Sequence, residues 1–288
     1  MSSFLQNYQR QPKLFIDLPS KGKWYDDTIL ADEQYVQIPV FGMNAMDEIM
    51  FKTPDALYSG DATAEVIKSC IPTILDPWKL VGYDIDYILI AIRIATYGEG
   101  MPAETLCPFC ATAAENEINL TTMLSNFASY ETEFYFDLND FRFHLSPITY
   151  KKTTEFSLEQ FHNEREMFQI DKHKDDIDPV EKDKALKKIY THGSDINVRL
   201  AISYISSITR DGEVETNTQA ITEFITHNDA EFFQELRNKI QELTYKWNLP
   251  LLKVTCPGEE CGKEYKASVN VDYSNFFGTR FLRSRNLI

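Results

Sequence analysis

The stretch Ile88-Leu-Ile-Ala-Ile-Arg-Ile-Ala-Thr-Tyr97 is apolar on nearly every side of a helix, and the pair Cys107-Pro-Phe-Cys110 follows it closely. A helix without a polar face belongs in the centre of a fold. Gly98 and Gly100 come directly after it, and glycine suits the left-handed position that ends many helices. The sequence therefore predicts a central helix that is followed at once by a short cysteine–proline turn.

A second cysteine–proline turn, Cys256-Pro-Gly-Glu-Glu-Cys261, is separated from the first one by 145 residues. Two such turns together supply the four sulfur ligands that Zn²⁺ prefers, at about 2.3 Å per bond in a tetrahedral site. We predict one structural zinc ion bound by Cys107, Cys110, Cys256 and Cys261, within a split element that resembles a zinc ribbon. A closed four-sulfur site leaves no open position for water or substrate, so this metal would serve architecture and not catalysis.

Other interpretations of Cys107-Pro-Phe-Cys110 make different demands on the surrounding sequence. A thiol–disulfide oxidoreductase that uses Cys107 needs an apolar strand before the motif and a helix after it, whereas this motif follows a glycine-rich segment and leads into polar residues. A zinc deaminase needs an upstream His-x-Glu motif, and the first histidine of this chain is His144. The oxidoreductase and a nucleic-acid-binding zinc ribbon stay open as alternatives. The fifth cysteine, Cys70, lies between Ile67 and Ile71 and is expected to be a small buried hydrophobe.

The composition favours protein partners over nucleic acid. The 288 residues include 29 Lys and Arg against 44 Asp and Glu, which gives a formal net charge of −15. Such a chain lacks the positive surface that duplex DNA or an anionic membrane attracts. The N-terminal residues have no apolar core of a secretory signal, and the longest apolar run, residues 87–95, is too short to span a membrane. We expect reduced thiols and a cytoplasmic setting.

The hydrophobic patterns predict an α+β fold, with mainly helical lobes and short antiparallel strands. Its expected domains are residues 1–145, 146–250 and 251–288. The Asp84-Ile-Asp86 carboxylates are interpreted as helix-start residues, and no Walker, GxGxxG, HExxH or GxSxG motif is present, so we predict no enzymatic activity. The expected strands are residues 13–18, 35–40, 115–120, 131–145 (a hairpin that turns at Asn139-Asp140), 251–255 and 265–271. The expected helices begin near Asn44 and Thr63 or cover residues 84–97, 149–170, 195–209, 218–227 and 229–247, with a charged loop and helix start over 171–188.

Three strings, in this order along the chain, resemble one protein family. They are Pro19-Ser-Lys-Gly-Lys-Trp-Tyr25, the helix of residues 86–98 that leads into CPFC, and the terminal CPGEECG…SNFFG. The chain resembles the baseplate-hub assembly and baseplate proteins of T-even-type contractile-tailed bacteriophages. The resemblance implies a noncatalytic protein that binds other baseplate or hub proteins, and further copies of itself, in a symmetric assembly. It also implies a location in the host cytoplasm during assembly and in the virion tail.

The adjacent aromatic residues Phe276 and Phe277 stand beside Gly278 near the C-terminus. Aromatic side chains are enriched among the anchors of protein interfaces. We predict that Phe276 and Phe277 contact a partner protein. The alternative is that they pack on the protein's own zinc-ribbon-like element.

Overall fold

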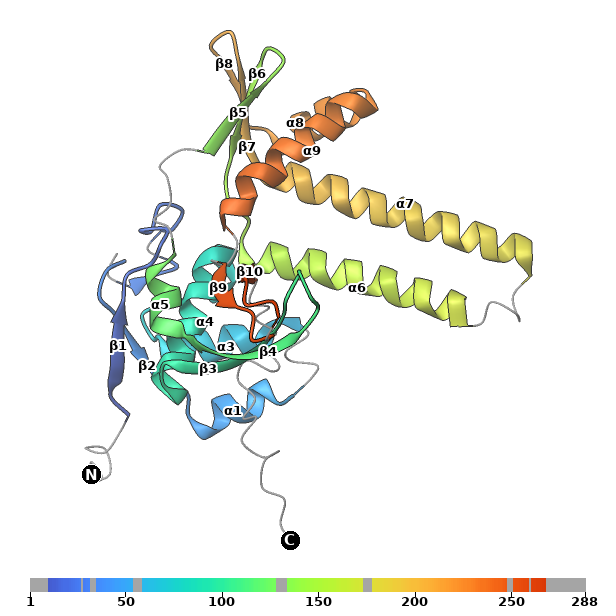
Figure 1. Ribbon diagram of the computed structural model, residues 1–288. Helices are drawn as coiled ribbons and strands as arrows, with labels where there is room; N and C mark the ends of the chain where they lie inside the picture. Colours follow the sequence, from blue (N-terminus) through green and yellow to red (C-terminus); the bar gives the residue numbers. More distant parts are fainter. Residues whose placement is uncertain are drawn as a thin grey trace. The chain divides into compact units, whose positions relative to one another are not determined.

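The computed structural model of the protein describes residues 10–26, 28–31, 35–53, 59–127, 134–172, 178–247, 251–258 and 260–267. The chain divides into two compact units (Figure 1). Unit 1 combines Met1–Tyr130 with Leu249–Ile288, and unit 2 is the intervening segment Glu131–Asn248. The two cysteine pairs therefore belong to the same unit although unit 2 separates them along the chain.

Unit 1 contains three two-stranded antiparallel sheets around a set of helices, and its strand pairs are β1–β2, β3–β4 and β9–β10. Its strands are β1 (Pro12–Ile16), β2 (Ile38–Phe41), β3 (Gly100–Leu106), β4 (Ala113–Asn119), β9 (Leu252–Thr255) and β10 (Glu264–Ala267). Its helices are α1 (Ala45–Phe51), α3 (Asp61–Cys70), the 3₁₀ turn η3 (Pro77–Lys79), α4 (Gly82–Tyr97) and α5 (Leu120–Ser125).

Helix α4 is the core of unit 1, as its all-round apolar sequence predicts. The five consecutive residues 88–92 are fully buried, which is possible only for a helix that other elements cover on every side. Gly98 ends the helix with a positive φ of 91°, a region that glycine enters without a steric cost. Asn44 caps α1, and its side chain accepts hydrogen bonds from the backbone N–H groups of Met46 and Asp47.

The carboxylate of Asp84 has a different role from the helix-start role that its position suggests. It is completely buried, and it accepts hydrogen bonds from the backbone N–H of Ser20 (3.1 Å) and from the hydroxyl of Tyr25 (2.6 Å). The Tyr25 hydroxyl also accepts a hydrogen bond from the N–H of Val81 (3.1 Å). Asp84 thus fixes the Pro19–Tyr25 turn against the N-terminus of α4.

Unit 2 is built on a four-stranded antiparallel sheet with the order β5-β6-β7-β8. Phe143 of β6 is fully buried, stacks on Phe136 of β5 at 5.2 Å, and approaches Phe232 of the last helix at 6.3 Å. The strands are β5 (Phe134–Leu138), β6 (Phe141–Leu145), β7 (Ile205–Arg210) and β8 (Glu213–Glu215). The helices are α6 (Tyr150–Lys172), α7 (Pro179–Ser203), α8 (Thr218–Thr226), α9 (Ala230–Thr244) and the 3₁₀ turn η4 (Tyr245–Trp247).

The division into units differs from the expected domain bounds of 1–145, 146–250 and 251–288. The β5–β6 hairpin, which the sequence pattern assigns to the N-terminal lobe, pairs instead with β7 of unit 2. Residues 205–209 were expected to be helical but form β7, because Ile205 and Ile208 complete the sheet beside β6. Pairing with β6 outweighs the local helical preference of these residues, and the local sequence carries no information about that pairing. Helix α3 also begins at Asp61, two residues before Thr63.

A candidate metal centre

Each cysteine pair lies in the loop of its own β-hairpin. Cys107 and Cys110 lie between β3 and β4, which pair in register from Gly100↔Asn119 to Leu106↔Ala113. Cys256 and Cys261 lie between β9 and β10, which pair from Leu252↔Ala267 to Thr255↔Glu264. Two hairpins from distant segments thus present one cysteine loop each.

The four sulfur atoms converge on one point of unit 1. They all lie within 4.8 Å of one another, with 3.8 Å between the Sγ atoms of Cys107 and Cys261 and 3.5 Å between those of Cys110 and Cys256. Four sulfurs at about 2.3 Å from a tetrahedral zinc ion stand about 3.8 Å apart. A disulfide needs about 2.05 Å, and all five cysteines are free thiols. The spacing therefore fits a metal ion held between the two hairpins.

The two cysteine loops share one backbone design. The residue directly after the second cysteine of each pair has a left-handed conformation, at φ 57° for Ala111 and φ 51° for Gly262. In the first loop the N–H of Ala111 donates to the carbonyl of Cys107 (2.8 Å), and in the second the N–H of Gly262 donates to that of Gly258 (3.1 Å). The left-handed residue turns the chain back, so that both cysteines of a pair face the same side.

Two further groups lie against the sulfur atoms, and neither was among the predicted site residues. The backbone N–H of Gly258 donates to Cys256 Sγ (3.4 Å), and the hydroxyl oxygen of Thr112 lies 3.2 Å from Cys110 Sγ. A Cβ atom at Gly258 would lie 3.4 Å from Cys256 Sγ and 3.5 Å from Thr112 Oγ1. The Thr112 hydroxyl accepts from the Cys110 thiol, and it can donate to the sulfur once the thiol is ionised. Donors such as this hydroxyl and the Gly258 N–H stabilise thiolates and orient metal ligands.

The sulfur cluster separates the pKa values of its thiols. Hydrogen bonds from the side chain and backbone of Thr112 lower the pKa of Cys110 to about 6. For Cys256 the N–H of Gly258 lowers the pKa, but burial and the neighbouring sulfurs of Cys110, Cys107 and Cys261 outweigh it, and the pKa is raised to about 12. Cys110 therefore ionises readily, whereas burial and the neighbouring sulfur atoms oppose the ionisation of Cys256. A bound cation would remove this opposition, as metal ions do for coordinated thiols.

Other contacts join the two hairpins around the cysteines. The hydroxyl groups of Thr105 on β3 and Tyr265 on β10 are 2.7 Å apart in a buried hydrogen bond. The Lys263 ammonium group lies 4.8 Å from the ring centre of Phe109. Cys107 and Cys256 share a small core with Val254, Tyr265 and Ala267. The C-terminal hairpin is thus attached to the first one by packing as well as by the candidate ligands.

The surroundings of Cys107 differ from those of a thiol–disulfide oxidoreductase. Cys107 is buried, and its loop leads into strand β4, whereas the oxidoreductase motif opens a helix whose N-terminus activates the first thiol.

Cys70 lies apart from the four-cysteine cluster. It is fully buried, as expected, and burial raises its pKa to about 12. Phe276 and Phe277 lie outside the described residues.

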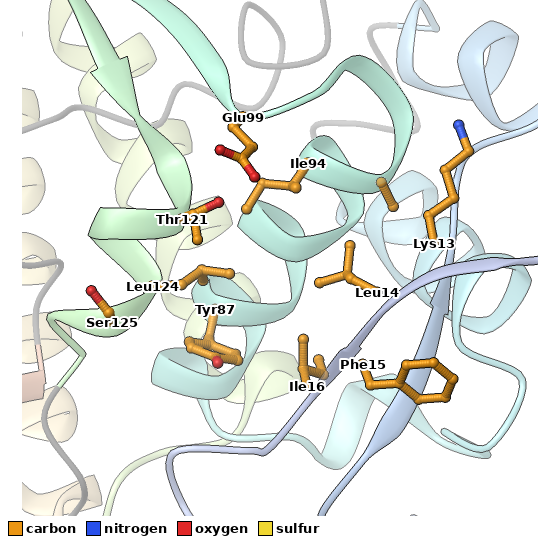
Figure 2. A pocket seen from close by; sticks show the side chains of 11 residues that line it. Lys13, Leu14, Phe15, Ile16, Tyr87, Ile94, Glu99, Thr121, Leu124 and Ser125 are labelled. Carbon is orange, nitrogen blue, oxygen red and sulfur yellow. The ribbon is translucent and has the colours of Figure 1, made fainter.

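Unit 1 also carries a groove of about 450 Å³ between β1, α4 and α5 (Figure 2). Figure 2 shows Leu14 and Ile16 on the side of β1 that faces α4, opposite Ile94 and Leu124, while Phe15 points away from them. Phe15 is 63 % exposed. The side chains that line this groove are mainly apolar and include no cysteine, so the groove does not resemble the cysteine cluster. In the part of the chain that the structure describes, no helix is both long and apolar enough to cross a membrane.

The fold and the site define an acidic two-unit protein whose N-terminal and C-terminal segments meet at four clustered cysteines. The sequence model of the family described as T4 bacteriophage base plate protein matches residues 39–278. The chain belongs to this family and is a structural protein of a T4-type phage baseplate. No curated protein sequence and no solved structure matches it.

Proposed function

We propose that the protein is a component of the baseplate hub, or of the region next to it, and that it binds other baseplate proteins. In this proposal one zinc ion, held by Cys107, Cys110, Cys256 and Cys261, fixes the two hairpins as a split zinc ribbon. The observation that supports the zinc site is the convergence of four thiols from segments 145 residues apart at spacings near those of a tetrahedral sulfur site. Membership of the baseplate family supports a place among other baseplate proteins.

The role assigned to the metal is architectural. Four cysteine ligands saturate zinc, so no position is left for a reacting molecule. What the ion supplies is a link, within unit 1, between the C-terminal β9–β10 hairpin and the β3–β4 hairpin. Family membership and an acidic surface favour protein partners, whereas a nucleic-acid-binding ribbon would require positive charge that this chain of net charge −15 lacks.

Native mass spectrometry combined with elemental analysis tests the zinc site. We expect one zinc ion per chain in the natural protein, and none after Cys107→Ser or Cys256→Ser. Cys70→Ser is the matched control, because that thiol lies outside the cluster, and it should retain the metal. A metal-free natural protein in which Cys107 reacts rapidly with alkylating reagents would favour the oxidoreductase alternative.

Phe276 and Phe277 stay a proposed partner contact. Together with Arg280 they lie in a segment that follows the β9–β10 hairpin by about ten residues. A Phe276→Ala/Phe277→Ala variant should keep its zinc and its fold but lose incorporation into baseplates when it replaces the natural protein during phage assembly. Normal incorporation would show that these two residues are not needed for partner binding.

A further inference from the structure

The helical hairpin of α6 and α7 in unit 2 has little core of its own. Of the side chains described in the 23-residue helix α6, only Phe156 is buried, and in the 25-residue helix α7 the buried side chains are Ile189, Ile196, Ala201 and Ile202. Helices of this length gain most of their stability from tertiary packing, and two helices alone provide one seam of it. The outer sides of both helices therefore have room for a further packing partner.

The outer side of α6 carries an exposed aromatic pair. Phe161 and Phe168 are 41 % and 68 % exposed, and their spacing of seven residues places them on one side of the helix. The side that faces α7 carries Glu159, which pairs with Arg199, and Asn163, which lies against Gly193. At about 100° per residue, the aromatic pair points roughly 140–180° away from that side.

The outer side of α7 carries an open hollow of about 600 Å³. Its lining residues are Lys184, Lys187, Lys188, Thr191, His192 and Asp195. Thr191 points roughly 160° away from Ile189 and Gly193, which face α6. The hollow extends from this outer side to the edge of the seam, where His192 and Asp195 lie near Glu159 of α6. The aromatic pair points away from that seam, so one copy of the chain does not bring the pair and the hollow together within itself.

The two surfaces lie at the same height along the hairpin. Glu159 is level with Arg199, and Asn163 is level with Gly193. Counting from these two pairs in the antiparallel hairpin, Phe161 is level with about Asp195 and Phe168 with about Lys188. By the same count Asp171 is level with about Lys187. The aromatic pair therefore spans the same stretch of the hairpin as the hollow.

The charges of the two helices are complementary along this stretch. From Glu155 to Asp171, α6 has five acidic residues and one basic residue. From Lys182 to Lys188, α7 has four lysines and one aspartate, although the whole chain is acidic. A second copy of this chain carries both the aromatic pair and the acidic side chains that a lysine-rimmed hollow attracts.

We propose that the hairpin is a self-assembly surface, in which the outer side of α6 in one copy packs on the outer side of α7 in the next. Phe161 and Phe168 enter the hollow, and Asp171 meets Lys187 of the neighbour. Each copy uses two different surfaces, so the contact repeats from copy to copy. Because the surfaces are level, each contact adds a copy without axial rise.

The proposed assembly goes beyond the metal-dependent function and does not depend on the metal. Sedimentation velocity of the full-length protein over a wide concentration range tests it. We expect species larger than a dimer that dissociate on dilution. Phe161→Gln/Phe168→Gln should weaken self-association by on the order of thirty-fold. Phe15→Gln, at an exposed phenylalanine of unit 1, is the matched control and should have no effect.

A charge exchange separates a specific contact from misfolding. Lys187→Asp alone and Asp171→Lys alone should each weaken self-association by roughly ten-fold, since each replaces an attraction by a repulsion. The two changes together should restore it. Lys239→Asp on α9 is the charge control. The proposal is overturned if the natural protein stays monomeric, if assembly stops at a dimer, or if the double variant is not restored.

The hairpin variants and the cysteine variants report on different proposals. Every hairpin variant should retain its zinc, and Cys107→Ser should still self-associate. Loss of zinc with intact assembly would therefore count against the metal site alone. Intact zinc without assembly would count against the hairpin contact alone.

Discussion

Asp84 shows how one buried residue connects a sequence motif to pH-dependent stability. Burial raises the pKa of its carboxyl to about 6, although hydrogen bonds from Ser20 and Tyr25 act in the opposite direction. An unfolded aspartate titrates near 3.9. Below about pH 4 the carboxyl is protonated in both the folded and the unfolded protein, so it does not reduce the free energy of unfolding. As the pH rises through about 6, the folded state must bury a charge, and this part of the stability is lost.

The Asp84→Asn variant should therefore lose this part of the pH dependence. Asparagine keeps an oxygen acceptor but carries no charge. Relative to the natural protein, we expect the free energy of unfolding of the variant to improve by about 2–3 kcal/mol between pH 4 and pH 7. Urea titrations followed by the fluorescence of Trp24 and Trp78, both in unit 1, measure it. A difference that stays constant with pH would contradict a titrating Asp84.

At the scale of the elements, the β3–β4 and β9–β10 hairpins use the same turn with different residues. The left-handed position holds Ala111 in one loop and Gly262 in the other. A left-handed conformation costs a non-glycine residue roughly 1–2 kcal/mol. A Cβ atom at Gly262 would meet nothing within 4 Å, so only the backbone preference distinguishes the two positions.

Exchanging these residues should change metal affinity in opposite directions. We expect Ala111→Gly to tighten zinc binding and Gly262→Ala to weaken it, each by about five-fold, which corresponds to about 1 kcal/mol. Competition with a chromophoric chelator measures the affinity. Ala113→Gly, at the extended start of β4, is the control and should not tighten binding. Equal affinities in all variants would mean that the turn is already fixed without the metal.

Local signals predicted most elements but not their partners. The Asn44 cap, the apolar α4 and the Asn139 turn, where φ is 52°, all formed where the sequence places them. The strand β7 did not follow its helical pattern, because it depends on a neighbouring strand from 60 residues earlier. Short apolar runs are compatible with either structure until a partner is known.

At the scale of the whole molecule, the candidate metal joins the two ends of unit 1, and removing it should have a local effect. Structural zinc contributes on the order of 10 kcal/mol in small metal-dependent folds. Here α4 and the β5–β8 sheet have cores that contain no cysteine of the cluster. We expect a chelator to increase hydrogen exchange in residues 107–112 and 256–263 while α8 and α9 stay protected. Cys107→Ser/Cys256→Ser without chelator should show the same pattern, and global unfolding would contradict it.

The cysteine pairs as candidate ligands, the central helix and the family can all be predicted from the sequence, because each depends on residue type and short-range spacing. Three features are visible only in the folded chain: unit 1 includes the C-terminal hairpin, β5 and β6 belong to unit 2, and Asp84 anchors a turn. The tertiary structure also placed Thr112, Gly258 and Tyr265 beside the cysteines. Thr112 and Gly258 are near their cysteines in the sequence, but the loop conformation decides that they face the sulfur atoms. The other contacts join residues far apart in the chain, and no local pattern encodes which distant groups will meet.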